Sequence, residues 1–486
     1  MSLMDAVVWT GRIYSAAGWV PGGAGESAVL EPATGAELGS IGLASESDVL
    51  KAATDAAHAQ RDWAARSPEA RAAVLRTAGR LWEEHAADVE HWLIREAGSI
   101  PPKAALETHV AAQECYEAAA LPTHPSGQVL PSAEPRWSFA RRRPVGVVSV
   151  IAPFNFPLIL SIRSVAPALA LGNAVLLKPD PRTAVGGGVS LVRIFAEAGL
   201  PDGLLQLLPG GRDLGPVFVT APEVRVVSFT GSTAAGRAVG ELAGRHLKRA
   251  HLELGGNNAL IVLPGADLAR AASAGAFGSF MHQGQICMTT GRHLVHESLH
   301  DEYVAALAAK AEHLPVGDPA AGPVALGPVI DAGQRDKIHT LVQESVTAGA
   351  RLAAGGTFEG LFYRPTVLAD VDPTMPAYAQ EVFGPVAPVL PFRDTAEAIA
   401  LAADSEYGLS LGILGPVGAA MEIADAVPSG IVHINEQTVS DEANIPFGGV
   451  AASGTGARSG GAEANIDAFT EGQWLTVRGE IASYPF

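Results

Sequence analysis

Apolar residues recur every three to four positions along the first quarter of the chain, and this period predicts helices. Two alanine-rich segments show it most clearly, at residues 48–65 and 70–96. From 127 to 150 the pattern changes to a short alternation of polar and apolar residues, which predicts a β-hairpin leading into a buried strand at 145–151. The chain is therefore expected to pass from packing helices into a sheet.

Short apolar runs then alternate with longer amphipathic ones. Strands are predicted at 145–151, 174–177, 204–208 and 224–229. Helices are predicted at 158–171, 187–198 and 233–247. Because the strands alternate with helices, we expect a parallel sheet wound with crossover helices.

A second α/β series extends from Gly256 to about Gly449, and a glycine-rich loop follows at 448–461. The tail has the pattern of a strand at 471–478. Together with the early hairpin, this strand is expected to form an edge that pairs with another subunit.

Length, charge and cysteine content narrow the class of protein. A chain of 486 residues is too long for one hydrophobic core and suggests about two to four domains. Its formal net charge of −18 argues against a nucleic-acid groove or an anionic membrane surface as a partner. Cys115 and Cys287 are the only cysteines, which fits a reducing compartment. No apolar run approaches the roughly 20 residues of a membrane span and no leader pattern opens the chain, so we expect a cytoplasmic protein.

Two glycine-rich segments carry the candidate chemistry, Leu252-Glu253-Leu254-Gly255-Gly256 and Gly284-Gln285-Ile286-Cys287. The Cys287 thiol can attack a carbonyl, and the Glu253 carboxylate can activate the water that releases the product. Taken singly, such a cysteine is more often a small buried hydrophobe and such a glutamate a paired surface carboxylate. Their roles therefore depend on the motifs around them.

Polar residues also stand where the predicted strands end. Asn155 follows the first buried strand, where ligands of open α/β sheets bind, and its amide could donate to an oxyanion. Lys178 ends the next strand and could bind ribose or phosphate. Gly231 and Ser232 open a helix whose free amides could hold a phosphate. Each residue also has a local interpretation, as a turn former, a solvated lysine or a helix cap. The G-x-G-x-x-G fingerprint is absent, so a nucleotide site would be built differently.

Seven segments in order make the chain similar to the aldehyde dehydrogenase superfamily over about residues 10–480. They resemble the family's P-W-N-F-P, K-P, F-T-G-S-T, L-E-L-G-G, G-Q-x-C, E-x-F-G-P and P-F-G-G motifs. In this chain they are Pro153-Phe154-Asn155-Phe156-Pro157, Lys178-Pro179, Phe229-Thr230-Gly231-Ser232-Thr233, Leu252 to Gly256, Gly284 to Cys287, Glu381-Val382-Phe383-Gly384-Pro385 and Pro446-Phe447-Gly448-Gly449.

The resemblance implies an α/β fold of aldehyde dehydrogenase type, with a Rossmann-type nucleotide-binding domain, an α/β catalytic domain and a small β oligomerisation element. It places the dinucleotide-binding domain at 1–124 and 145–254 and the catalytic domain at 255–450. The oligomerisation strands would lie at 125–144 and 465–486, in a homodimer or a homotetramer.

The resemblance also implies a mechanism. Cys287, as thiolate, would attack an aldehyde, while the Asn155 amide and the Cys287 backbone N–H hold the oxyanion. Hydride transfer to a nicotinamide would leave a thioester, which Glu253 hydrolyses to the acid by activating water.

The cofactor is expected to be NAD, with NADP possible, because Pro181 stands where many NAD-preferring relatives carry glutamate. Asp180 could partly replace that glutamate. No metal site is expected. The residues implied to contact the cofactor are Ile151, Ala152, Pro153, Phe154, Lys178, Asp180, Gly211, Phe229, Thr230, Gly231, Ser232, Leu254, Glu381 and Phe383.

The segments 158–167 and 434–449 look like the benzaldehyde and vanillin dehydrogenase branch, so an aromatic aldehyde is the expected substrate. The candidate pocket walls are Phe156, Leu160, Ile286 and Met288, each of which could also be core. An aliphatic aldehyde or a semialdehyde is the alternative substrate. A coenzyme-A-acylating enzyme and a catalytically silent relative are further alternatives, both disfavoured because Glu253 is present together with the other catalytic residues.

A zinc-protease interpretation comes from His296-Glu297-Ser298-Leu299-His300, which spells H-E-x-x-H. Residues 294–296 are expected to complete a strand, with Ser298 and Asp301 forming a capping box that starts a helix after His296. The two histidines would then not share one helix face, which argues against this interpretation.

Overall fold

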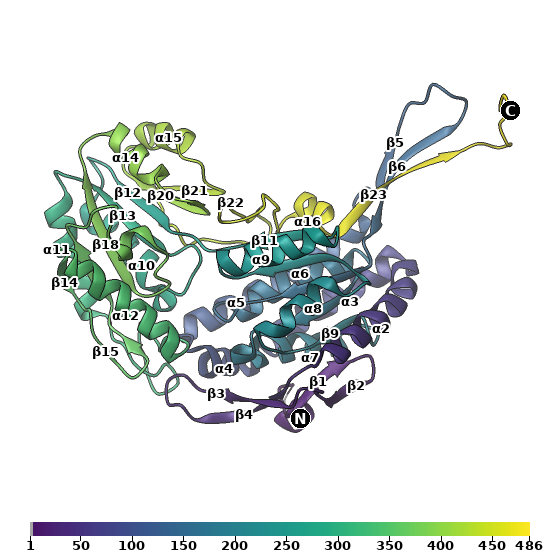
Figure 1. Cartoon of the computed structure of the whole chain (residues 1–486), viewed down its shortest axis with the longest axis horizontal. Helices are drawn as coiled ribbons and strands as arrows, with labels where there is room; N and C mark the ends of the chain where they lie inside the picture. The colour runs from purple at the N-terminus through teal and green to yellow at the C-terminus, as the bar shows by residue number, and fades with distance from the viewer. Residues whose placement is uncertain (1–2) are drawn as a thin grey trace.

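Two large sheets, a thin three-stranded arm and three small two-stranded sheets form the β-structure of the protein, as a computed structural model describes it for residues 3–486 (Figure 1). Both large sheets have seven strands, and the arm projects from the body with the C-terminus at its tip. The predicted α/β organisation with a separate β element is confirmed.

The first sheet holds five parallel strands with an antiparallel pair at one edge. Its order is β11 (Arg249–Glu253), β10 (Val224–Thr230), β7 (Val147–Ile151), β8 (Ala174–Lys178), β9 (Leu205–Leu207), β1 (Arg12–Ser15) and β2 (Gly18–Pro21). The central strands β7 and β8 are buried at every residue, as expected of parallel strands covered on both faces. From β7 the chain winds one way through β8 and β9 and the other way through β10 and β11. Ligands of such sheets bind at this reversal, outside the carboxyl ends of β7 and β10.

Helices pack around this sheet and form one core with it. They are α2 (Glu46–Ala65), α3 (Pro68–Glu84), α4 (Ala86–Ala97), α5 (Pro101–Ala120), α6 (Pro157–Ala170), α7 (Ser190–Glu197), α8 (Gly215–Thr220) and α9 (Thr233–Arg245). The single helix predicted at 70–96 is wrong, because the chain leaves helical geometry at His85 (φ −108°, ψ 15°) and α3 and α4 meet there. The apolar spacing continues across the break and hides it.

The helix predicted at 187–198 begins earlier, as a π-helical turn at Val185–Val189 that continues into α7. The buried carboxylate of Glu96 accepts hydrogen bonds from the amides of Val185 (2.9 Å) and Gly186 (2.7 Å). A side chain 89 residues away thus caps this turn, which local sequence could not reveal.

The second sheet holds six parallel strands and one antiparallel edge strand. Its order is β14 (Arg351–Ala354), β17 (Thr366–Ala369), β18 (Val386–Phe392), β13 (Thr290–His296), β12 (Asn258–Val262), β20 (Ser410–Leu414) and β21 (Ile431–Ile434). Alternate residues of β12 enter two different cores, as the pleat requires. Helices α10 (Leu268–Phe280) and α11 (His300–His313) contribute to one core. Helices α12 (Ala332–Thr347), α14 (Thr395–Ala403) and α15 (Val417–Ala426) contribute to the other.

The arm joins residues 127–144 to the C-terminal tail. Strand β6 (Trp137–Pro144) pairs antiparallel with β5 (Gly127–Val129) on one side and with β23 (Thr470–Val477) on the other. Helix α16 (Ala462–Phe469) leads directly into β23. The predicted hairpin and tail strand therefore pair with each other in one chain. Trp137 of β6 and Trp474 of β23 are about two-thirds exposed, at 65% and 66%.

Candidate active site

The loop from Ile151 to Pro157 is held by a buried ion pair on α5. Lys103 Nζ bonds to the Glu107 carboxylate and donates to the backbone oxygen of Asn155 at 2.8 Å. Glu107 Oε2 accepts the amides of Leu158 (3.0 Å) and Ile159 (3.3 Å), which are free donors at the start of α6. Both charged side chains have no exposed surface. The pair therefore fixes where the Asn155 loop ends and where α6 begins.

The Cys287 thiol follows a strained turn. His282, Gln283 and Gly284 all adopt left-handed φ angles, of 47°, 57° and 65°. Only glycine fits the third position, because a Cβ on Gly284 would lie 2.1 Å from the backbone oxygen of Gly384. Beyond the turn, Asn258 Nδ2 donates to the backbone oxygen of Cys287 at 2.8 Å. These contacts fix the backbone on both sides of the sulfur.

Cys287 lies at the junction of two cavities, and Asn155 lies there with it. One cavity, of about 170 Å³, is formed by the residues after β7 and β10 together with Leu254, Glu381 and Phe383. The other, of about 220 Å³, is mostly apolar. All four candidate wall residues, Phe156, Leu160, Ile286 and Met288, line the second cavity. The thiol can thus meet a molecule in either space.

Asn155 has the donor that an oxyanion would need. Its Nδ2 carries two hydrogens, and one is given to the backbone oxygen of Gln285 at 2.9 Å. Asn155 is 3% exposed, so few water molecules compete for the hydrogen bonds of its amide. The side chain and the Cys287 loop are therefore bonded to each other, although they are 130 residues apart in sequence.

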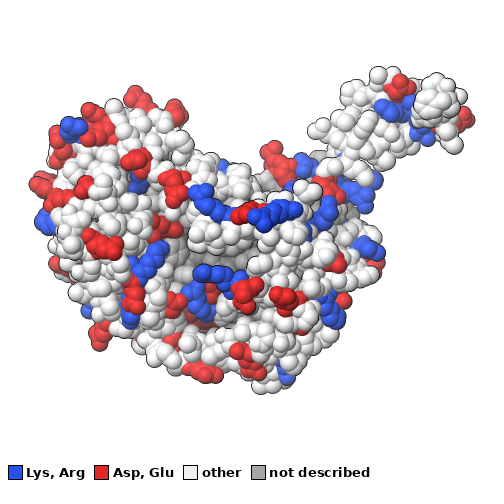
Figure 2. All heavy atoms as spheres, in the orientation of Figure 1, with Lys and Arg blue, Asp and Glu red and all other residues white. Residues whose placement is uncertain are grey.

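A third cavity of about 470 Å³ lies between α8 and α9, beside the ends of β7, β8 and β10. Its lining includes Ile151, Lys178 and Phe229 together with Arg212, which sequence reasoning missed. Figure 2 shows a hollow near the middle of the molecular face, with Lys and Arg side chains on both sides of it.

Most of the predicted cofactor residues gather at these cavities, and three do not. Thr230, Gly231, Ser232, Pro153 and Phe154 line the cavity at Cys287. In contrast, Ala152, Asp180 and Gly211 line neither that cavity nor the one beside α9. The Asp180 carboxylate instead accepts two bonds from the Arg182 guanidinium, at 2.9 and 2.7 Å.

Glu253 ends β11 but does not line either cavity at Cys287. Its side chain borders a small separate space with Arg163 and Arg458, and its Oε2 is buried with no hydrogen-bond partner in residues 3–486. Burial raises the pKa of Glu253 to about 8, against the opposing effect of Arg458 and Arg163.

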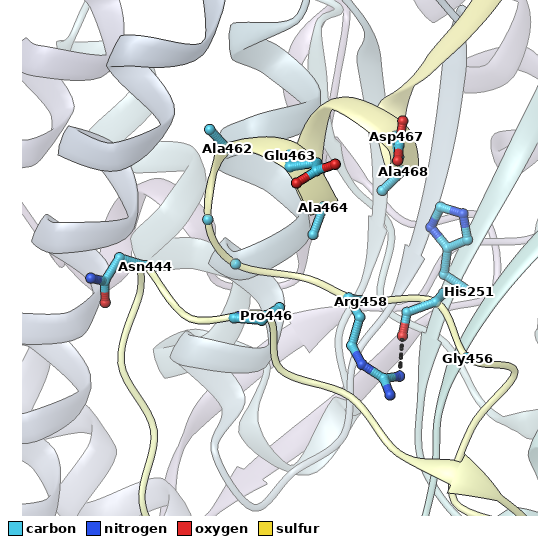
Figure 3. A pocket seen from close by; sticks show the side chains of 13 residues that line it. His251, Asn444, Pro446, Gly456, Arg458, Ala462, Glu463, Ala464, Asp467 and Ala468 are labelled. Carbon is cyan, nitrogen blue, oxygen red and sulfur yellow. Dashed lines mark hydrogen bonds between the residues drawn. The ribbon is translucent and has the colours of Figure 1, made fainter. Parts of the chain in front are cut away.

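Arg458 connects this region to a larger cavity of about 580 Å³ beside α16 (Figure 3). Its Nη1 donates to the backbone oxygens of Gly449 (3.0 Å) and Ala457 (3.1 Å). Glu463 and Asp467 of α16 also line this space, but Cys287 does not. The larger cavity is therefore not where the thiol could react.

The neutral thiol is the favoured form of Cys287. Burial raises its pKa to about 12, and the carboxylates of Glu381, Glu253 and Asp441 add to the effect. The sequence motif does not show that three acidic groups lie near the sulfur.

Charged residues in the apolar cavity were also missed. Arg163 and Asp441 both line it, and Arg163 Nη2 bonds to Asp441 Oδ2. Arg163 is the one charge within the apolar run 157–171, and this isolation was the available signal.

His296 and His300 of the H-E-x-x-H segment belong to different elements. His296 ends β13 and His300 begins α11, so they do not share a helix face, as predicted. The predicted capping box is wrong, because the N-cap is Leu299 with no side-chain bond. Ser298 Oγ instead bonds to the His296 ring at 2.8 Å.

The described part of the chain has no helix long and apolar enough to cross a bilayer.

A thiol thus lies at the ligand-binding crevice of a doubly wound sheet. The chain belongs to the aldehyde dehydrogenase family, whose sequence model matches residues 19–475, and the protein is an oxidoreductase. It is 67% identical to a vanillin dehydrogenase of Amycolatopsis sp., with both chains fully covered. It is 47% identical to a benzaldehyde dehydrogenase (NAD+) of Pseudomonas putida, with 99% of this chain and 98% of the relative covered.

A solved structure resembles the whole fold. The salicylaldehyde dehydrogenase of Pseudomonas putida G7, complexed with salicylaldehyde, superimposes with a TM-score of 0.94 at 34% sequence identity. The match covers 98% of this chain and 99% of that one. The predicted family and its fold are confirmed.

Removing Lys103 tests the buried support under Asn155. In Lys103→Ala the Glu107 charge stays buried without its partner, so the free energy of unfolding should fall by about 3–5 kcal/mol. The matched control is Lys51→Ala, which breaks an exposed pair with Asp55 at the same helical spacing and should cost about 0–1 kcal/mol. Urea unfolding compares the two, and equal losses would contradict a structural role for the buried pair.

Proposed function

We propose that this protein oxidises an aromatic aldehyde to the carboxylic acid with NAD as electron acceptor. The observation that carries the proposal is the position of Cys287 and Asn155 at the junction of an apolar cavity and a crevice at the sheet reversal. The apolar cavity suits an aromatic ring, because Phe156, Leu160 and Phe447 line it. The similarity to vanillin, benzaldehyde and salicylaldehyde dehydrogenases supports the same substrate class.

The chain's residues fit a dinucleotide. Helix α9 borders two cavities, since its N-cap Ser232 lines one and Ala235 the other. The free amides at its N-terminus suit a pyrophosphate, and Gly231 leaves room for one to approach. Lys178 would contact the adenosine half, and Glu381 and Phe383 the nicotinamide half. NAD, when bound there, supplies the acceptor for the hydride that leaves the aldehyde carbon.

Use of NADP is also proposed. Pro181 carries no charge to repel a 2′-phosphate, and the Asp180 carboxylate is paired with the Arg182 guanidinium, which also pairs with Asp331. Lys178 and Arg212 add two positive charges to the cavity beside α9.

The first half of the reaction uses Cys287 and Asn155. Cys287 Sγ gives its proton to water and attacks the aldehyde carbon, and the carbonyl oxygen becomes an oxyanion. The second Nδ2 hydrogen of Asn155 and the Cys287 backbone N–H hold that oxyanion. Loss of hydride from the same carbon leaves a thioester on Sγ.

The second half uses Glu253. Its carboxylate turns from the small space beside Arg458 toward the thioester and takes a proton from the attacking water. Water oxygen bonds to the acyl carbon, the carbon–sulfur bond breaks, and the acid leaves while Sγ regains a proton. The unpartnered Oε2 means that no hydrogen bond of that atom to the described residues is lost on turning.

Replacing the thiol tests the proposed chemistry. Cys287→Ala should abolish NADH formation from benzaldehyde, and Asn155→Ala should slow it by about 10²- to 10³-fold because one oxyanion donor is lost. Cys115→Ala removes the other cysteine, which is buried in the core away from these cavities, and should leave the rate unchanged. NADH absorbance gives all three rates, and full activity of Cys287→Ala would exclude the mechanism.

The pKa of Glu253 predicts the pH dependence. Its pKa of about 8 keeps the base protonated and inactive below that pH, so kcat should rise with pH through about 8 and then level. Glu253→Gln should keep a first turnover of NADH but lose about 10²- to 10⁴-fold in steady-state rate. Glu344→Gln, an exposed change on α12, is the control. If the rise of kcat with pH persists unchanged in Glu253→Gln, that rise belongs to another titrating group.

We further propose the domain division 1–124 with 145–254, 255–450, and 125–144 with 465–486, the last as the oligomerisation element of a homodimer or homotetramer. The exposed apolar side chains of the arm support this role. A cytoplasmic location is proposed because both cysteines are free.

A charge on the arm tests the oligomerisation element. Trp137→Glu should lower the mass measured by light scattering toward that of a monomer, because the charge would be buried between subunits. Met421→Glu, on an exposed position of α15 outside the arm, should keep the native mass. A monomeric native protein, or an unchanged mass in Trp137→Glu, would contradict the proposal.

A further inference from the structure

The apolar cavity at Cys287 contains one ion pair among otherwise mostly apolar walls. Arg163 has a side chain only 4% exposed, and Asp441 has one that is 19% exposed. Both line the same cavity as the thiol. Burying a charge among apolar side chains costs free energy unless its hydrogen-bonding atoms have partners.

Arg163 has two of its three nitrogens engaged. Nε donates to Glu114 Oε1 at 3.1 Å, and Nη2 bonds to Asp441 Oδ2. The guanidinium also stacks on Phe447, with 4.9 Å between Cζ and the ring centroid. Nη1 is buried and has no hydrogen-bond partner among residues 3–486.

Asp441 is also incompletely bonded. Its Oδ2 receives Arg163, whereas Oδ1 is buried with no hydrogen-bond partner in the described chain. One ion pair therefore has a spare donor, on Arg163 Nη1, and a spare acceptor, on Asp441 Oδ1. A buried group left unpaired costs free energy, and a ligand that bonds to both atoms recovers it.

Helix α6 fixes how far Arg163 lies from the end of the cavity that contains Cys287. Leu160 and Arg163 are three residues apart on α6, so they lie on one helix face, and Phe156 lines the same cavity from the residue that precedes the helix. Arg163 lies about 9 Å along the helix axis from its first residue, which directly follows the Asn155 loop. A flat ring lying against Phe156 and Leu160, with its aldehyde at Cys287, would extend along this face toward Arg163.

We propose that Arg163 and Asp441 together bind a hydroxyl group on the aromatic ring of the substrate. A hydroxyl both donates and accepts, so it can donate to Asp441 Oδ1 and accept from Arg163 Nη1. An ether oxygen can only accept, and a hydrogen or methyl substituent satisfies neither atom. A ring carboxylate can accept from Arg163 Nη1, but it has no hydrogen to give to Asp441 Oδ1 and would face the Asp441 charge. The inference rests on the proposed aromatic aldehyde oxidation and names its preferred substrates, the hydroxybenzaldehydes.

Substrate preference tests the hydroxyl site. The native enzyme is assayed with benzaldehyde, 3- and 4-hydroxybenzaldehyde, their methyl ethers and 4-formylbenzoate. The better hydroxybenzaldehyde should exceed benzaldehyde and its own methyl ether in kcat/KM by about 10- to 100-fold, the effect of a hydrogen bond to a charged group. 4-Formylbenzoate should be the poorest. Equal kcat/KM for the hydroxybenzaldehydes and benzaldehyde would overturn the proposal.

Asp441→Ala then tests the residue, because it removes the spare acceptor while Arg163 keeps Glu114 as its partner. The preference for the hydroxyl over hydrogen should fall to about threefold or less. Asp425→Ala makes the same change on the exposed face of α15 and should keep the native preference. A preference that is as large in Asp441→Ala as in Asp425→Ala would overturn the proposal.

Binding separates this inference from the proposed reaction. In Cys287→Ala, calorimetry should show that the better hydroxybenzaldehyde binds about 10-fold more tightly than benzaldehyde, and that Cys287→Ala/Asp441→Ala loses the difference. Equal binding of the two aldehydes to Cys287→Ala would count against the hydroxyl site. Failure of the native protein to oxidise any of these aldehydes would instead overturn the proposed function, whatever the binding shows.

Discussion

The active site depends on one buried ion pair, Lys103 with Glu107, that lies beneath the loop after β7. The ammonium group holds the backbone of Asn155, and the carboxylate holds the first amides of α6. Since α6 carries Leu160 and Arg163 and directly follows Phe156, the same pair sets both the oxyanion donor and one wall of the cavity. Neither charge reaches solvent, so each is stable only with the other.

Electrostatics around the sulfur then determine how the site can work. Burial raises the pKa of the Cys287 thiol, with a further contribution from the acidic groups near it, and burial also raises the pKa of Glu253. A resting site with neutral sulfur and a protonated base avoids placing further negative charge near Asp441 and Glu381. The Asn155 amide, which carries no charge, would then donate a hydrogen bond to the oxyanion.

Much of this arrangement follows from local sequence, and the exceptions have physical causes. The strand ends that carry Asn155 and Ser232 can be predicted from the apolar runs and the turns after them. The turn before Cys287 can be predicted from Gly284. The partners of Arg163 lie 49 and 278 residues away, so no local pattern reveals its ion pair or its unpaired nitrogen. The break at His85, the orientation of Glu253 and the absence of a cap at Ser298 likewise depend on tertiary contacts.

The central claim is that Cys287 carries the acyl group between the two halves of the reaction. Mass spectrometry of Glu253→Gln, mixed with NAD+ and benzaldehyde and digested at mildly acidic pH, tests it most directly. The account predicts a benzoyl group on the Cys287 peptide, which raises the mass of the peptide by that of benzaldehyde less two hydrogens, and no such increase in Cys287→Ala/Glu253→Gln. An unmodified Cys287 peptide after a full first turnover of NADH would contradict the account.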